Sequence, residues 1–125
     1  MNKVIFIEDN LEIRENTVEI LELAGYSTCT AADGNEGLAV IAKQSPDIIL
    51  CDIHMPNMNG FEVFWSIKAD STVSNIPFVF VTASAEKKEM ESALSLGADG
   101  YICKPFDSNE LLELVFRLLG NSKRQ

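Results

Sequence analysis

Short apolar runs alternate along the chain with longer amphipathic segments, and this alternation predicts a series of strand–helix units. We predict strands at residues 3–7, 26–31, 47–51, 77–81 and 99–103. Helices are predicted at residues 10–24, 35–44, 60–70, 85–96 and 108–119. Because the strands are apolar almost throughout, we expect both faces of their sheet to be covered by helices.

Capping residues support these helix boundaries. An aspartate followed three positions later by a glutamate can cap a helix start, and this pattern occurs at Asp9 and Glu12, Asp33 and Glu36, and Asp107 and Glu110. Gly25 and Gly97 are placed to end the first and fourth helices. The predicted helix at residues 60–70 has an apolar stripe with Trp65 near its edge. Trp65 is either a packing residue, which we favour, or a contact for a partner.

Five strand–helix units in this order predict an α/β fold with a doubly wound, five-stranded parallel sheet, flavodoxin-like (βα)5, in strand order 2-1-3-4-5. We expect one domain over residues 1–120 and a short polar tail over 121–125. In this strand order the ligand crevice lies outside the carboxyl ends of strands 1 and 3.

Charge and cysteine content narrow the class of protein. The net charge of −9 argues against direct binding to nucleic acid or to an anionic membrane, because both need clustered basic residues. We expect a cytoplasmic protein without a signal peptide or membrane span, and three reduced cysteines fit that compartment. Cys51 and His54 have a metal-like separation, but no second ligand pair follows, so zinc is a weak interpretation.

Reactive side chains follow four of the predicted strands. Glu8 and Asp9 follow the first, Asp52 the third, Thr82 the fourth and Lys104 the fifth. Each has an ordinary explanation: Asp9 can cap a helix, Asp52 and Thr82 can stabilise turns, and Lys104 can be a solvated lysine. The carboxyl ends of parallel strands meet at one edge, however, so together these residues predict a site.

Three carboxylates in one crevice repel each other, by about 4 kcal/mol for two unit charges 4 Å apart at an effective dielectric near 20. A hard cation relieves that repulsion, and Mg²⁺ prefers oxygen ligands. With a lysine and a hydroxyl beside it, a free carboxylate oxygen is suited to accept a phosphoryl group. We therefore predict Asp52 as a nucleophile that forms an aspartyl phosphate.

Along its whole length the chain resembles the receiver domain of two-component response regulators. The matching segments are residues 4–9, Asp52 to Pro56 with Asn59 and Gly60, residues 81–83, Ala98 to Tyr101, and Lys104 to Phe106. The resemblance implies a signalling switch that takes its phosphoryl group from a sensor histidine kinase or a histidine phosphotransfer protein. It implies no enzyme activity beyond the chain's own phosphorylation and dephosphorylation.

Site roles follow from the resemblance, residue by residue. Asp52 is implied as the phosphoacceptor, and Asp9, Glu8, Asp52 and the His54 backbone carbonyl as the ligands of Mg²⁺, with Mn²⁺ as a substitute. Backbone groups of His54 and Ala83 would contact the phosphoryl group together with Lys104, and the Lys104–Pro105 bond is expected to be cis. Thr82 and Tyr101 would switch the surface of helix 4, strand 5 and helix 5 toward an unknown target protein, in a monomer or weak dimer.

Two positions depart from the family pattern. Glu8 stands where family members commonly carry aspartate, and His54 lies two residues past the acceptor, where we interpret its side chain as exposed. Three other functions compete with the switch. One is a pseudo-receiver that is never phosphorylated. Another is a haloacid dehalogenase-like phosphatase, disfavoured because His54 replaces its second aspartate. The third is a flavin-binding flavodoxin relative, disfavoured because Glu8 and Asp9 occupy the phosphate loop.

Overall fold

Five parallel strands form one sheet in the order β2-β1-β3-β4-β5 in the computed structural model, which describes residues 2–83 and 86–123. The strands are β1 (Lys3–Ile7), β2 (Ser27–Ala31), β3 (Ile48–Asp52), β4 (Phe78–Thr82) and β5 (Gly100–Cys103). Each strand is paired in parallel with its neighbours, and the strand order is the one that the sequence predicts. The doubly wound α/β fold is therefore confirmed.

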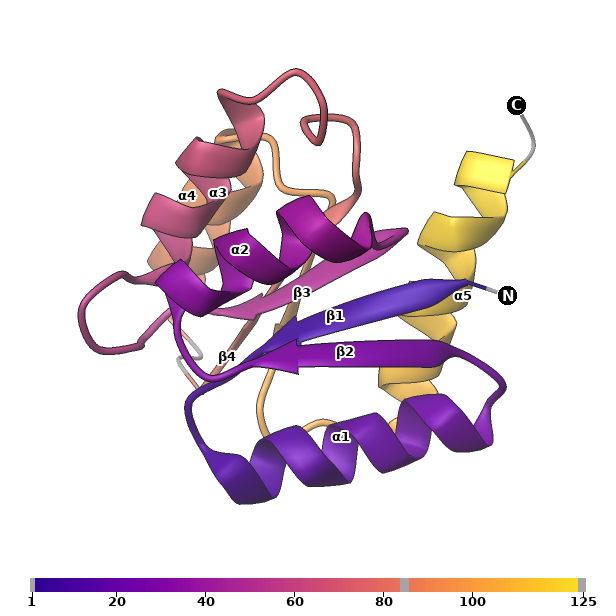
Figure 1. Cartoon of the computed structure of the whole chain (residues 1–125). Coiled ribbons are helices and arrows are strands. Elements are labelled where there is room, and N and C mark those ends of the chain that lie inside the picture. The colour runs from indigo at the N-terminus through magenta and orange to yellow at the C-terminus, as the bar shows by residue number, and fades with distance from the viewer. Residues whose placement is uncertain (1, 84–85, 124–125) are drawn as a thin grey trace.

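Helices cover both faces of this sheet (Figure 1). They are α1 (Leu11–Leu23), α2 (Gly34–Gln44), α3 (Gly60–Lys68), α4 (Lys87–Ser95) and α5 (Ser108–Lys123). In Figure 1, α1 and α5 lie on one side of the sheet, and α2, α3 and α4 lie on the other. Within the described ranges, no helix is both long and apolar enough to cross a membrane.

The sheet separates two apolar layers because successive side chains of each strand point to opposite faces. Ile5, Ile49 and Phe80 face α2, α3 and α4, whereas Val4, Leu50 and Val81 face α1 and α5. All six are completely buried, which explains why the strand segments are almost continuously apolar.

The predicted boundaries differ from the observed ones mainly at the ends of elements. β3 and β4 each extend one residue further than predicted, so that Asp52 and Thr82 are their last residues. The predicted end of the last helix at residue 119 is wrong, because α5 continues to Lys123. Gly120 does not take the left-handed backbone conformation that would end the helix. Residue 85 of the predicted fourth helix and residues 124–125 of the predicted tail lie outside the described residues.

The start of α1 is capped by a different residue from the one predicted. Asn10 is the N-cap, and its side-chain oxygen accepts a hydrogen bond from the Ile13 backbone N–H at 2.9 Å. Asp9 therefore does not cap the helix. At the other ends of α1 and α4, Gly25 (φ 98°) and Gly97 (φ 108°) have the left-handed conformation that glycine favours.

α3 starts in close contact with the end of β3. A Cβ atom on Gly60 would clash with the Asp52 backbone carbonyl oxygen and lie 2.8 Å from the Ile53 Cα. Only glycine lets the two backbones approach this closely. On the same helix, the ring of Trp65 lies against that of Phe61 with centroids 6.4 Å apart, but the residue is 54% exposed, so Trp65 packs only in part.

Candidate functional site

The reactive side chains gather at the carboxyl ends of the strands. Glu8 directly follows β1, Asp52 and Thr82 are the last residues of β3 and β4, and Lys104 directly follows β5. Because β1 and β3 are adjacent at the centre of the parallel sheet, their acidic residues meet at one edge. The sequence analysis predicts this gathering, and the structure brings the three acids and the lysine together.

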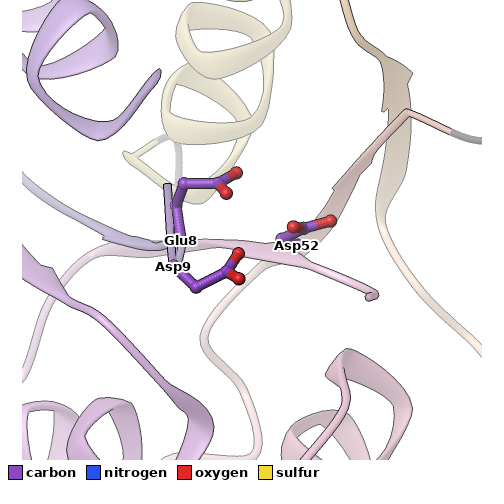
Figure 2. A group of neighbouring side chains, drawn as sticks. All are labelled: Glu8, Asp9 and Asp52. Carbon is purple, nitrogen blue, oxygen red and sulfur yellow. The ribbon is translucent and has the colours of Figure 1, made fainter. Parts of the chain in front are cut away.

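Three carboxylates, from Glu8, Asp9 and Asp52, form an acidic cluster (Figure 2). One oxygen from each lies within 4.8 Å of the others. Glu8 and Asp52 are buried, with 1% and 4% of their surfaces exposed, whereas Asp9 is exposed. In the part of the chain that the structure describes, the Asp9 carboxylate has no hydrogen bond, because Asn10 caps α1 in its place.

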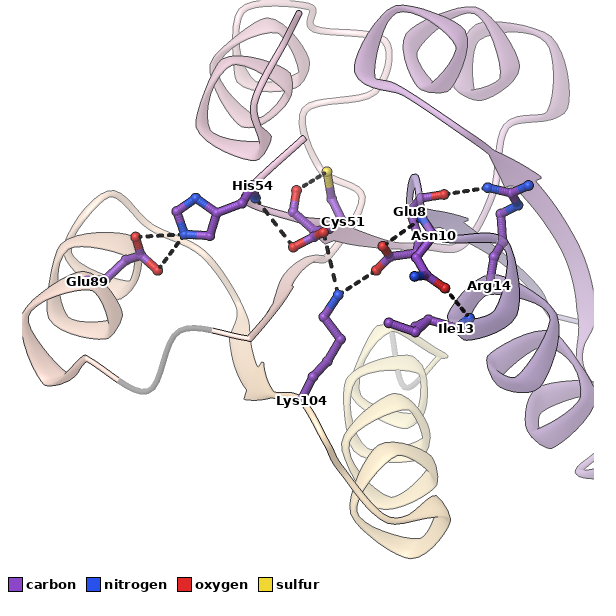
Figure 3. Close-up of polar contacts among 9 residues, drawn as sticks. Glu8, Asn10, Ile13, Arg14, Cys51, His54, Glu89 and Lys104 are labelled. Atoms are coloured by element: carbon purple, nitrogen blue, oxygen red, sulfur yellow. Dashed lines mark hydrogen bonds and ion pairs between the residues drawn. The ribbon is translucent and has the colours of Figure 1, made fainter. Parts of the chain in front are cut away.

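Lys104 reaches into this cluster between Glu8 and Asp52 (Figure 3). Its Nζ lies 2.7 Å from Glu8 Oε1 and 3.5 Å from Asp52 Oδ2, so Glu8 is the nearer partner. The other Glu8 oxygen, Oε2, accepts a hydrogen bond from the Asn10 backbone N–H at 3.1 Å. The peptide bond from Lys104 to Pro105 is cis.

Burial dominates the electrostatics of the two inner carboxylates. It raises the pKa of Glu8, and the hydrogen bond from Lys104 opposes that rise only in part. It likewise raises the pKa of Asp52 against the opposing charge of Lys104. The single ammonium group of Lys104 therefore does not balance the negative charge of the carboxylates in the cluster.

The cluster fits a hard divalent cation. Its donors are carboxylate oxygens, which Mg²⁺ prefers, and they lie close enough for one ion to contact all three. Asp9 has the freest carboxylate for such an ion, since Glu8 already accepts hydrogen bonds at both oxygens.

The loop after β3 borders Asp52 from another side. The His54 backbone N–H donates a hydrogen bond to Asp52 Oδ1 at 3.3 Å, while the His54 side chain is exposed, as expected. Ala83 follows Thr82 in the loop after β4 and is exposed, whereas Thr82 is completely buried.

Cys51 and His54 do not form a zinc site. Cys51 is completely buried, and its thiol donates to the Asp52 backbone oxygen at 3.3 Å. Burial raises the pKa of this thiol well above its usual range, which disfavours the thiolate that binds zinc. Cys29, Cys51 and Cys103 are not joined by disulfide bonds, as predicted.

Sequence analysis missed Glu89, which contacts two residues at the border of the site. The glutamate lies on α4, and its carboxylate contacts the His54 ring and the Tyr101 hydroxyl. His54 and Glu89 are 35 residues apart, and no motif links them. The amphipathic pattern of α4 would place Glu89 on a polar face, but only the docking of the helix on the sheet reveals what that face meets.

A mainly apolar cleft of about 450 Å³ adjoins Lys104. It lies between α1 and the loop after β5, and its lining includes Ile13, Thr17, Ile20 and Phe106. The cleft shares Lys104 and Ala83 with the border of the site, so a partner seated in it would be next to the acidic cluster.

Comparison with known proteins identifies one family over almost the whole chain. The family model of the response regulator receiver domain matches residues 4–116. The transcriptional regulator RpaA of Synechocystis sp. is 33% identical over 124 residues, which are 99% of this chain and 52% of RpaA. The phosphate regulon regulator PhoB of Pseudomonas aeruginosa is 36% identical over 120 residues, 94% of this chain and 52% of PhoB. The chain thus spans about half the length of these curated relatives.

Comparison with solved structures indicates the same receiver-domain family. The chemotaxis protein CheY4 of Vibrio cholerae superimposes with a TM-score of 0.88 at 34% identity, covering 94% of this chain and 98% of CheY4. The signal receiver domain of a histidine kinase from Syntrophus aciditrophicus has a TM-score of 0.91 at 30% identity, covering 100% of this chain and 95% of that domain.

Proposed function

Because this chain belongs to the receiver domains of response regulators, which act as phosphorylation-controlled signalling switches, we propose that Asp52 is its phosphoacceptor. The convergence of Lys104 and three carboxylates at the end of β3 carries this proposal. It puts a nucleophilic oxygen, an ammonium group and a set of cation ligands within one crevice.

In the proposed reaction, an Asp52 carboxylate oxygen attacks the phosphorus of a phosphohistidine on a partner protein. A phosphorus–oxygen bond forms, and the phosphorus–nitrogen bond breaks with its electron pair remaining on the imidazole. Lys104 and the backbone N–H groups of His54 and Ala83 would contact the phosphoryl oxygens. The domain would catalyse this step and the later hydrolysis on itself only.

Asp9, Asp52 and the His54 backbone carbonyl would hold Mg²⁺, with Glu8 contributing directly or through water and Mn²⁺ able to substitute. When bound, the ion neutralises charge on the carboxylates and the phosphoryl oxygens. The free Asp9 carboxylate and the raised pKa values of Glu8 and Asp52 support this assignment.

Thr82 and Tyr101 are proposed as the switch pair. The buried Thr82 hydroxyl would move toward the phosphoryl group, and the Tyr101 ring would turn inward behind it. The surface formed by α4, β5 and α5 would change and be recognised by a target protein. We propose a cytoplasmic monomer or weak dimer with a sensor histidine kinase or a phosphotransfer protein as donor, and no direct contact with nucleic acid or membrane.

Labelling with acetyl phosphate and Mg²⁺, followed by mass mapping, tests the acceptor. We expect a single phosphoryl group on Asp52 in the wild type and none in Asp52→Asn. Asp70→Asn is a matched control, because Asp70 lies in an exposed turn where it binds Thr72. Label retained by Asp52→Asn would assign the phosphoryl group to another residue. A wild type that takes no label would instead indicate a phosphorylation-independent interaction module.

A further inference from the structure

Glu89 holds two groups from different parts of the chain with one carboxylate. His54 Nε2 lies 3.2 Å from Glu89 Oε2 and 3.4 Å from Glu89 Oε1. The Tyr101 hydroxyl donates to Glu89 Oε1 at 3.4 Å. Figure 3 shows the His54 ring pointing away from the acidic cluster toward Glu89 on α4.

The two groups come from different elements of the fold. His54 belongs to the loop after β3, and its backbone N–H donates to Asp52 Oδ1. Tyr101 belongs to β5 and is half-buried. Burial, and next the negative charge of Glu89, raises the pKa of Tyr101 to about 12, so its hydroxyl keeps the proton that it donates.

We propose that Glu89 is a positioning residue that couples the loop bearing His54 to the side chain of Tyr101. This coupling rests on the proposed function for one assumption, which is that Tyr101 moves when Asp52 is modified. A movement of Tyr101 away from Glu89 removes one of the partners that fix this carboxylate. The contact between Glu89 and His54 then changes. The position of the loop whose His54 backbone N–H donates to Asp52 changes with it.

Glu89 is suited to this role by its partial burial. Its side chain is 21% exposed, compared with 61% for the His54 side chain, so water competes less for the glutamate than for the histidine. Both contacts depend on the same carboxylate, and Oε1 is shared between His54 and Tyr101. Two groups that share one partner are expected to respond non-additively to substitution, even without touching each other.

The single histidine of the chain makes this coupling directly measurable. The His54 ring C–H signals are recorded by NMR at one fixed pH, without ligand. Tyr101→Phe keeps the aromatic ring and removes only the hydroxyl, and we expect it to shift the His54 signals. In a Glu89→Ala background the same substitution should leave them unchanged. Tyr26→Phe, at the other tyrosine, and Glu91→Ala, at an exposed glutamate of α4, are the matched controls.

Glu89→Gln distinguishes positioning from a general effect on folding. An amide oxygen can still accept the Tyr101 hydrogen bond, so we expect this variant to retain part of the response of His54 to Tyr101→Phe. A response of equal size with and without the Glu89 carboxylate would overturn the proposal. So would the absence of any response in the wild type.

Binding of beryllofluoride with Mg²⁺, an acyl phosphate mimic, tests the consequence for the site. Contacts that favour the ligand-free arrangement oppose binding, so Glu89→Ala should bind the mimic about fivefold more tightly than Glu91→Ala. Equal affinities would contradict the coupling. If the wild type bound no mimic, the proposed function would fail, whereas the histidine signals would still decide the role of Glu89.

Discussion

At the scale of single residues, the site contains two buried carboxylates that differ in their dependence on Lys104. Glu8 is 2.7 Å from the ammonium and Asp52 is 3.5 Å from it, although burial raises the pKa of both. Removing the charge of either residue relieves repulsion in the cluster. Removing the charge of Lys104 instead leaves both buried carboxylates without their compensating ammonium.

Asp52→Asn is therefore expected to stabilise the metal-free protein by about 1 kcal/mol at neutral pH. A carboxyl whose pKa is raised on folding binds protons more tightly in the folded state. Its contribution to stability is full below the ordinary pKa of 3.8 and is lost as the pH rises through the raised value. Urea denaturation should thus show the two proteins converging as the pH is lowered toward about 4. An advantage of the variant that did not change with pH would contradict this origin.

Lys104→Met is expected to have the opposite effect. It removes the ammonium that lies 2.7 Å from the buried Glu8 carboxylate and 3.5 Å from that of Asp52. We expect a loss of about 1–3 kcal/mol in the free energy of unfolding at neutral pH, measured in the same urea titrations. Glu8→Gln combined with Lys104→Met should recover much of the loss, and a double variant as unstable as Lys104→Met would contradict the explanation.

The sequence identifies most residues of the site but not the contacts among them. Asp52, Glu8 and Lys104 could be predicted because a parallel sheet brings its carboxyl ends together. The nearer pairing of Lys104 with Glu8 depends on side-chain reach, which strand-end positions do not specify. Asp9 could not be separated from a helix cap, since Asp9 and Asn10 are both good caps and backbone geometry selects the second.

At the scale of elements, the close approach of α3 to β3 fixes the loop that carries His54. The N-terminal Gly60 of α3 donates its backbone N–H to the Ile53 carbonyl at 2.8 Å. Asn59 and Glu62 form a capping box that fixes the same helix start. The loop between Asp52 and α3 is therefore held at both ends.

Gly60→Ala is expected to destabilise the protein by about 2–4 kcal/mol, because the new Cβ would overlap the backbone of β3. It should also shift the amide signal of His54, since the end of β3 must move. Gly120→Ala is the matched control: its Cβ meets nothing within 4 Å on α5, and the change should be neutral or stabilising by up to about 1 kcal/mol. Thermal denaturation and amide NMR spectra measure both effects.

Secondary structure could be predicted well where the hydrophobic pattern and the residues that end helices agree. Gly25 and Gly97 end α1 and α4 as expected, because left-handed glycines mark these turns. Gly120 gives the same sequence signal yet lies within α5. The sequence cannot distinguish these cases, since a glycine ends a helix only where the following chain turns away.

At the scale of the whole molecule, the net charge of −9 makes the chain a favourable partner for cations, and among the described residues three carboxylates gather in the acidic cluster, from the ends of β1 and β3. The strand order could be predicted because five strand–helix units and the acids at strands 1 and 3 select one doubly wound arrangement. The sequence does not predict which helix face contacts which loop, and for this reason Glu89 was missed.

Mg²⁺ is expected to stabilise the folded protein, because the cluster exists only when β1 and β3 are paired. At ten times the dissociation constant, the gain should be about 1.4 kcal/mol. Asp9→Asn should lose most of this gain, whereas Asp33→Asn, at the N-cap of α2, should retain it. Thermal unfolding in Mg²⁺ is compared with NaCl of equal ionic strength. An equal rise in both salts would indicate general screening instead of a specific site.

The turns at Gly25 and Gly97 join helices to the amino ends of strands, at the edge of the sheet opposite the acidic cluster. A Cβ at either position would meet nothing within 4 Å. These turns are consequently suitable places to insert a fluorescent reporter domain, because inserted segments are best tolerated in exposed turns. An insertion after Gly97, between α4 and β5, would join the reporter to the two elements that Glu89 and Tyr101 connect, and would turn the domain into an optical biosensor.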